Sequence, residues 1–150
     1  MTSNSPFTHL VVLESIPSAG VEACKKILAE LKANKFDKDD IFAVHLALEE
    51  ALTNAVKHGN KMDPRKQVKI EYSVTDEKID VCISDQGQGF APERIADPRY
   101  GQNLYKTGGR GLFLIRSYMD TVKFNERGNC VRMVKFRQKP PGPSTKNYSN

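Results

Sequence analysis

Glu-Ala-Leu-Thr-Asn-Ala-Val-Lys-His-Gly, at residues 50–59, is the stretch that decides the fold. In a helix, Glu50, Asn54 and His58 fall on one face at spacings of four residues, and two earlier alanines leave space beside them. An apolar stripe for the core lies on another face and consists of Val44, Leu48, Leu52 and Ala55. The small side chains of Ala43 and Ala47 could let a ligand approach this polar face of the helix. An exposed polar face is the commoner meaning of such a pattern, and the helix alone does not exclude it.

The flanking segments predict an α+β fold. Residues 67–74 and 79–83 alternate between apolar and polar, as expected for strands with one buried face, and the short polar link between them predicts a hairpin. The other expected elements are a strand at 7–13, a helix at 19–33 capped by Ser18, a helix after Gly111, and strands at 121–126 and 130–137. A further helix begins at the acidic cluster near Asp37, runs to about His58 and stops at Gly59-Asn60. This order predicts a two-layer α/β sandwich, in which a mixed, mostly antiparallel sheet is covered on one face by about three helices.

A short acidic and glycine-containing motif follows the second strand of the predicted hairpin. It consists of residues 85–89, Asp-Gln-Gly-Gln-Gly, so Asp85 is expected at the strand's end, where its carboxylate could accept a hydrogen bond from an exocyclic amine. The two glycines permit a tight turn or a close approach of the backbone to a ligand. A plain glycine-rich turn explains the motif equally well, and its spacing is not that of the dinucleotide-binding folds.

A second glycine-rich motif, Gly-Gly-Arg-Gly at residues 108–111, leads directly into the predicted third helix. Free backbone N–H groups and the positive end of the helix dipole suit a phosphate there. Residues 85–110 show no periodicity, and a loop of this length in a compact domain is usually functional or disordered. Each motif is weak when taken alone, whereas their order along the chain is specific.

Composition narrows the classes of protein to consider. The net charge is +5, but a run without acidic residues near the C-terminus supplies most of it through Lys135, Arg137, Lys139 and Lys146. The preceding sequence has no cluster of Lys and Arg of the nucleic-acid-binding kind, so we expect no direct nucleic-acid partner.

Cys24, Cys82 and Cys130 show no metal-binding spacing and are expected to be free thiols. The sequence shows no bilayer-spanning segment or signal peptide, so we expect a cytoplasmic protein, with residues 139–150 as a disordered tail.

The ordered set of motifs resembles the Bergerat-type ATP-binding fold of histidine kinases, DNA gyrase and related ATPases. Over residues 8–137 the chain is most similar to the small anti-sigma-factor serine kinases, which have the pattern Glu-Ala-x-Thr-Asn-Ala-x-x-His-Gly at the position of residues 50–59. The resemblance implies one histidine-kinase-like ATP-binding domain over residues 1–138, with ATP and Mg²⁺ bound. The chain departs from the family's usual threonines after the turn near Gly128, where it has Asn129 and Cys130.

The resemblance also implies a role for each motif. Glu50 would act as the catalytic base, Asn54 would bind Mg²⁺, and Asp85 would bind the adenine amine. Glycines of the two motifs would shape the base pocket and meet the phosphates. The implied nucleotide-binding set is Asn54, Lys57, His58, Asp85, Gly87, Gly89, Phe90, Thr107, Gly108, Gly109, Arg110, Gly111 and Leu112.

The function that the resemblance implies is regulation of transcription by a serine/threonine kinase. The chain would phosphorylate a serine or threonine of an anti-anti-sigma partner, sequester a sigma factor, and work as a homodimer. The alternative is a module that binds its protein partner and ATP without significant kinase activity. An ATPase of the chaperone or mismatch-repair kind, or a sensor histidine kinase, is less expected, because such proteins need further domains or a helical hairpin that carries a phospho-acceptor histidine.

Overall fold

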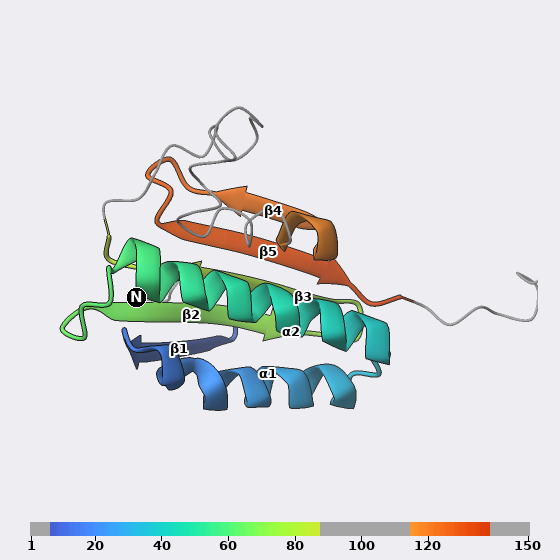
Figure 1. The fold of residues 1–150 in the computed structure, drawn as a ribbon. Helices are drawn as coiled ribbons and strands as arrows, with labels where there is room; N and C mark the ends of the chain where they lie inside the picture. The colour runs from blue at the N-terminus through green and yellow to red at the C-terminus, as the bar shows by residue number, and fades with distance from the viewer. Residues whose placement is uncertain (1–6, 88–114, 139–150) are drawn as a thin grey trace, which may run out of the picture.

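The computed structural model describes residues 7–87 and 115–138 and shows two layers (Figure 1). Helices α1 (Val21–Ala33) and α2 (Lys38–Thr53) lie together on one face of a five-stranded sheet. The strands are β1 (His9–Glu14), β2 (Gln67–Val74), β3 (Lys78–Ser84), β4 (Thr121–Phe124) and β5 (Cys130–Phe136). The predicted α+β sandwich is confirmed.

The sheet has the order β1-β2-β3-β5-β4, and every strand pair in the described part of the chain is antiparallel. The predicted hairpin is confirmed as β2–β3, in which Ile70 lies opposite Ile83. Residues 115–118 are helical and agree with the third helix expected after Gly111, whose beginning lies outside the described residues. The expected tail at 139–150 lies outside them as well. None of the described helices is long and apolar enough to span a bilayer.

The hydrophobic core lies between the two helices and one face of the sheet. Alternate residues of β2 and β3 point toward the helices, and α1 and α2 contribute the other half of the core. The fully buried side chains include Ile27, Leu31, Val44, Leu48, Val68, Ile70, Ile79 and Val81. Each such side chain contributes about 1.5–3 kcal/mol relative to an exposed one, so the core fixes how α2 lies on the sheet.

The beginning of α1 differs from the prediction. Ser18 does not cap the helix; it lies inside a 3₁₀ turn, η1 (Pro17–Gly20), and α1 begins at Val21 without a side-chain cap. Pro17 has a fixed φ that suits the first position of a helical turn, so the chain becomes helical before the serine. The turn packs closely on α2, because a Cβ at Gly20 would lie 2.8 Å from Cδ1 of Leu52.

Helix α2 begins as predicted, with the Asp37 carboxylate accepting a hydrogen bond from the Asp40 N–H at 2.8 Å. Its last turn is different, because the helix widens into a π-helix, η2 (Asn54–Gly59). The Asn60 N–H accordingly donates to the carbonyl of Ala55, five residues earlier, at 2.8 Å. π-turns inside helices occur frequently at functional sites, and this one begins at the asparagine that the sequence had marked.

Candidate functional site

Two of the predicted motifs meet where η2 approaches the end of β3. A Cβ placed on Gly59 would lie 2.3 Å from Oδ2 of Asp85, and a Cβ on Gly87 would lie 1.9 Å from the carbonyl oxygen of Gly59. A side chain at Gly87 would collide with the backbone of Gly59, and a side chain at Gly59 would force the Asp85 carboxylate to move. The two motifs therefore form one site, in which the Asp85 carboxylate lies against the backbone that ends η2.

Asn60 holds the three segments of this site together from inside the protein. Its side chain is fully buried, and its Nδ2 donates to Ser15 Oγ at 3.0 Å and to the Gln67 carbonyl at 2.9 Å. Its Oδ1 accepts from the Gln86 N–H at 2.8 Å. The sequence had indicated this residue only as part of the signal that ends the helix. No local pattern in the sequence points to this role, because the partners of Asn60 come from three separate segments.

The Asp85 carboxylate is both buried and partly paired. Burial raises its pKa, while a hydrogen bond from the Gly87 N–H to Oδ1, at 2.8 Å, and the charge of Lys66 lower it. No hydrogen bond from a described residue to its second oxygen is found, and that oxygen is the natural acceptor for an amine of a ligand. Asp85 therefore offers a carboxylate oxygen that can accept a hydrogen bond from a ligand amine.

Asn129, one of the two departures from the family pattern, supports the same loop. Its backbone carbonyl accepts from the Asp85 N–H at 2.9 Å, and its Nδ2 donates to the Gly87 carbonyl at 3.3 Å. The turn before β5 thus holds Asp85 and Gly87 from the side opposite to Asn60.

Asn54 lies at the junction between α2 and η2. Its amide nitrogen is buried and has no hydrogen-bond partner among the described residues. Buried polar groups are almost always paired, so this amide has its partner outside the described residues, in another part of the chain, in water or in a ligand. A side-chain amide oxygen at this place suits a magnesium ion whose other ligands are phosphate oxygens and water.

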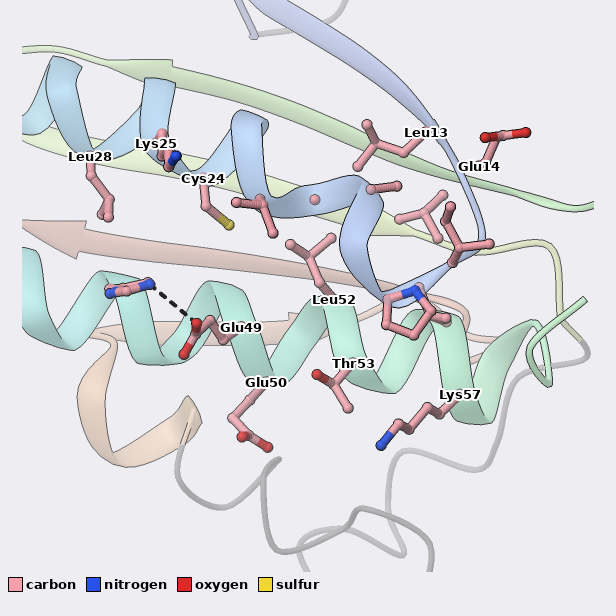
Figure 2. Close-up of a pocket in the computed structure, with 18 residues that line it drawn as sticks. Leu13, Glu14, Cys24, Lys25, Leu28, Glu49, Glu50, Leu52, Thr53 and Lys57 are labelled. Carbon is pink, nitrogen blue, oxygen red and sulfur yellow. Dashed lines mark ion pairs between the residues drawn. The ribbon is translucent and has the colours of Figure 1, made fainter. Parts of the chain in front are cut away.

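Three polar side chains near Asn54 point from α2 and η2 to the side away from α1. Figure 2 shows this for Glu50, Thr53 and Lys57. His58, on the same segment as Lys57, is exposed, and its pKa is lowered first by partial burial and then by the charges of Lys57 and Lys61. The imidazole is therefore mainly neutral at pH 7.

A cavity of about 410 Å³ lies between β1, η1, α1 and α2 (Figure 2). Its walls are mainly apolar, and a His45–Glu49 pair, with 3.3 Å between Nε2 and Oε2, contributes polar groups. Glu50 and Lys57 also contribute to the lining, whereas Asn54 and Asp85 do not. The cavity therefore adjoins the site around Asp85 and does not coincide with it.

Comparison with known proteins assigns the family. The family model described as "Histidine kinase-like ATPase domain" matches residues 14–135. The chain is 34% identical to the serine-protein kinase RsbW of Listeria innocua over 108 residues, which cover 67% of this chain and 69% of that protein. It is 31% identical to RsbW of Bacillus licheniformis over 126 residues, which cover 75% of this chain and 77% of that protein. It is 37% identical to RsbW of Staphylococcus epidermidis over 109 residues, which cover 67% of this chain and 69% of that protein.

The chain belongs to this family of protein serine kinases. The fold agrees with a crystal structure of the RsbU and RsbW domains of Rv1364c from Mycobacterium tuberculosis, with a TM-score of 0.52 and 15% identity. The matched region covers 89% of this chain and 34% of that longer chain, so this likeness shows the fold alone. The resemblance stated from the residue 50–59 motif is confirmed.

The structure describes five of the thirteen residues in the predicted nucleotide-binding set. Asp85 and Gly87 lie against the end of η2, Asn54 begins η2, and Lys57 and His58 lie within it. The remaining predicted residues lie outside the described part of the chain; they are Gly89, Phe90, Thr107, Gly108, Gly109, Arg110, Gly111 and Leu112. The ATPase family supports ATP as the nucleotide.

Proposed function

We propose that this chain is an ATP-dependent kinase that phosphorylates a serine of an anti-anti-sigma protein, and that it sequesters a sigma factor when that protein is phosphorylated. The relatives named serine-protein kinase RsbW support the kinase activity. The observation that carries the proposal is the joining of Gly59, Asp85 and Gly87 into one site, next to the unpaired amide of Asn54.

Each described residue has a role that its surroundings support. Asp85 accepts a hydrogen bond from the adenine amine through its second carboxylate oxygen, while Gly87 and Asn129 hold the loop in place. Glu50 lies one helical turn before Asn54 and accepts the proton of the attacking serine hydroxyl. The serine oxygen forms a bond to the γ-phosphorus, the bond to the β–γ bridging oxygen breaks, and ADP leaves.

Magnesium fits the site through Asn54. When bound, the ion would neutralise charge on the phosphates. The side-chain amide of Asn54 would hold it with a hard oxygen ligand, and the other ligands would be phosphate oxygens and water. Among the residues that the structure describes, no group of three His, Cys, Asp or Glu side chains could hold a metal ion. Asn54 is assigned to magnesium by the family resemblance and by its amide oxygen.

The proposal extends to assembly and location. We assign residues 1–138 to a single kinase domain that acts in the cytoplasm, as a homodimer and without direct nucleic-acid contact. Exposed Leu10 and Val12 on β1, the strand at the sheet edge, support self-association there. The three free cysteines agree with a reducing compartment. Light scattering of the purified chain measures the mass of the assembly and tests the dimer.

The kinase activity is tested with Glu50→Gln. Full-length wild type and variant are incubated with labelled ATP, Mg²⁺ and candidate anti-anti-sigma proteins, and label on a partner serine is measured. We expect the variant to bind ATP with unchanged affinity and to lose phosphoryl transfer by about 10²-fold or more, the range for removal of a general base.

Glu49→Gln is the matched control. Glu49 is the neighbouring residue, is exposed, and forms a pair with His45, so this variant should retain transfer. Equal transfer by wild type and Glu50→Gln would refute the assignment of the base. Tight partner binding by the wild type without any label on the partner would support the alternative of a binding module that lacks kinase activity.

A further inference from the structure

The proposed phosphoryl transfer leaves the cavity of about 410 Å³ between α1 and α2 unused. Its volume lies within the range of small-molecule sites in proteins, about 300–1,000 Å³. Neither Asn54 nor Asp85 lines it, and its walls come from β1, β2, η1, α1, α2 and η2. The cavity and the kinase site are therefore separate spaces, although Glu50 and Lys57 of the kinase site also contribute to the cavity wall.

The interior of this cavity is apolar, because side chains from both helices and the sheet converge on it. Figure 2 shows Cys24 and Leu28 of α1 and Leu52 of α2 pointing into the space between the helices. Val68 of β2, which is fully buried, also lines the cavity. The other apolar lining residues are Leu13, Ile16, Pro17, Ala19, Val21 and Val56. Water finds few hydrogen-bond partners in such a space, so burial of an apolar molecule there is favourable.

Two local features keep this space open. The lining residues of α1 recur at spacings of three and four residues, so one face of the helix forms the wall, and Cys24 in the middle of that face has a small side chain. The second feature is the contact between η1 and α2, where a Cβ on Gly20 would lie 2.8 Å from Cδ1 of Leu52. That contact fixes how closely η1 approaches α2, and the short side chain of Cys24, one turn further along, leaves the adjacent space unfilled.

Most charged residues of the lining direct their charge elsewhere. The charged ends of Glu14, Glu50 and Lys57 point away from the space between the helices (Figure 2). The Nζ of Lys25 lies 3.5 Å from Oε2 of Glu22, a residue outside the lining. These four side chains therefore contribute little charge to the interior.

Glu49 is the lining residue whose charge acts on the interior. Burial first, and then the charge of Glu49, raise the pKa of Cys24 to about 11, so this carboxylate lies within electrostatic reach of the thiol that points into the cavity. Its Oε2 lies 3.3 Å from Nε2 of His45, one helical turn earlier, and its side chain is 57% exposed. A carboxylate at the edge of an apolar space suits a ligand with an apolar body and one positively charged end.

We propose that this cavity binds a small amine with an apolar aromatic body, a class of ligand distinct from the nucleotide of the kinase site. The rings fill the space among Leu28, Leu52 and Val68, and the ammonium group lies against the Glu49 carboxylate at the edge. Because Asn54 and Asp85 do not line the cavity, the amine and ATP bind at the same time. The site does not depend on the proposed kinase activity.

The test uses the full-length chain and naphthylmethylamine, which combines a two-ring apolar body with an amine that is charged at neutral pH. Isothermal titration calorimetry measures affinity and stoichiometry, and NMR of methyl-labelled protein identifies the residues that contact the probe. We expect one saturable site, with the largest shifts at Leu28, Leu52 and Val68. Binding should persist at saturating ATP and Mg²⁺, whereas competition by ATP would place the probe in the nucleotide site and overturn the proposal.

A variant that fills the cavity should lose probe binding. Cys24→Phe places a ring where the rings of the probe would lie, so the affinity should fall by about tenfold or more. Ala29→Phe is the matched control and should bind the probe like wild type, because Ala29 is exposed on the same helix and does not line the cavity. Circular dichroism checks that each variant is folded, and Leu28→Trp, at a partly buried position, replaces Cys24→Phe if that variant does not fold. Undiminished binding by a folded filling variant would overturn the proposal.

Two analogues with the same rings test the role of Glu49. Naphthalenemethanol lacks the charge and should bind about two- to fivefold more weakly than the amine, the range for a solvent-exposed ion pair. Naphthoate, which carries a negative charge, should bind more weakly still. Glu49→Gln should remove the preference for the amine over the alcohol while both compounds still bind. Stronger binding of naphthoate than of the amine, an unchanged preference in Glu49→Gln, or no saturable binding of the amine by the wild type would each overturn the proposal.

Discussion

Replacing Asn60 with alanine should destabilise the protein and damage the nucleotide site together. The side chain makes three hydrogen bonds, to Ser15 Oγ, to the Gln67 carbonyl and from the Gln86 N–H. A hydrogen bond contributes about 1 kcal/mol net, and a buried partner left unpaired costs about 1–3 kcal/mol. We therefore expect Asn60→Ala to lower the free energy of unfolding by about 3–5 kcal/mol, a large part of the total for a domain of this size.

Urea denaturation followed by circular dichroism measures this loss, and a fluorescent ATP analogue measures binding at urea concentrations where both proteins are folded. Asn34→Ala is the control, because Asn34 makes a single side-chain hydrogen bond, to the Glu30 carbonyl at the end of α1. It should cost no more than about 1 kcal/mol and leave binding unchanged. A loss below 1 kcal/mol for Asn60→Ala, or unchanged ATP affinity, would show that Asn60 does not hold the segments as inferred.

Three further predictions follow from individual contacts. Gly87→Ala should abolish ATP binding, since its Cβ would lie 1.9 Å from the Gly59 carbonyl oxygen; calorimetric titration with ATP checks this, and normal affinity would contradict it. Asp85→Asn should lose ATP binding yet gain stability relative to wild type as pH rises from about 4 to 7. Burial raises the pKa of Asp85, so the native state holds more protons than the unfolded chain above the ordinary value of 3.8, and wild-type stability falls through that window. Parallel urea titrations at several pH values should show the gain; a constant difference would refute the reasoning. Lys135→Met should lower the free energy of unfolding by about 3–5 kcal/mol, because it removes the ion-pair partner of the buried Asp40 carboxylate, with Nζ 3.7 Å from Oδ1. Adding Asp40→Asn to this variant should recover much of the loss. If the losses of the two single variants simply add in the double variant, the two residues are not coupled.

The arrangement of strands and helices was predictable because its causes are local. Alternation along β2 and β3 identified both strands and their buried faces, and the acidic cluster at Asp37 marked the beginning of α2. The beginning of α1 was not predictable from the same rules, because Ser18 has the chemistry of a cap while Pro17 starts a 3₁₀ turn one residue earlier. The π-turn at Asn54–Gly59 was also hidden, since six residues are too few to distinguish its period from that of an α-helix.

The residues of the site were predictable one by one, whereas their contacts were not. The sequence marked Gly59 as a helix end and Gly87 as part of a turn. The structure shows that each glycine leaves room for the other segment, Gly59 for the Asp85 carboxylate and Gly87 for the Gly59 carbonyl. A contact between segments far apart in the chain leaves no trace in the local pattern of either one. Asn60 was missed for the same reason, because its three partners come from different segments.

Asn129 shows how a departure from a family pattern acquires a physical meaning. The family usually has threonine in this region, whereas this chain has Asn129. Asn129 instead donates its side-chain amide to the Gly87 carbonyl and accepts the Asp85 N–H through its backbone. The backbone hydrogen bond is available to any residue, whereas a threonine side chain is shorter and carries a hydroxyl in place of the amide. The turn before β5 therefore supports the Asp85 loop in this chain by a direct side-chain contact.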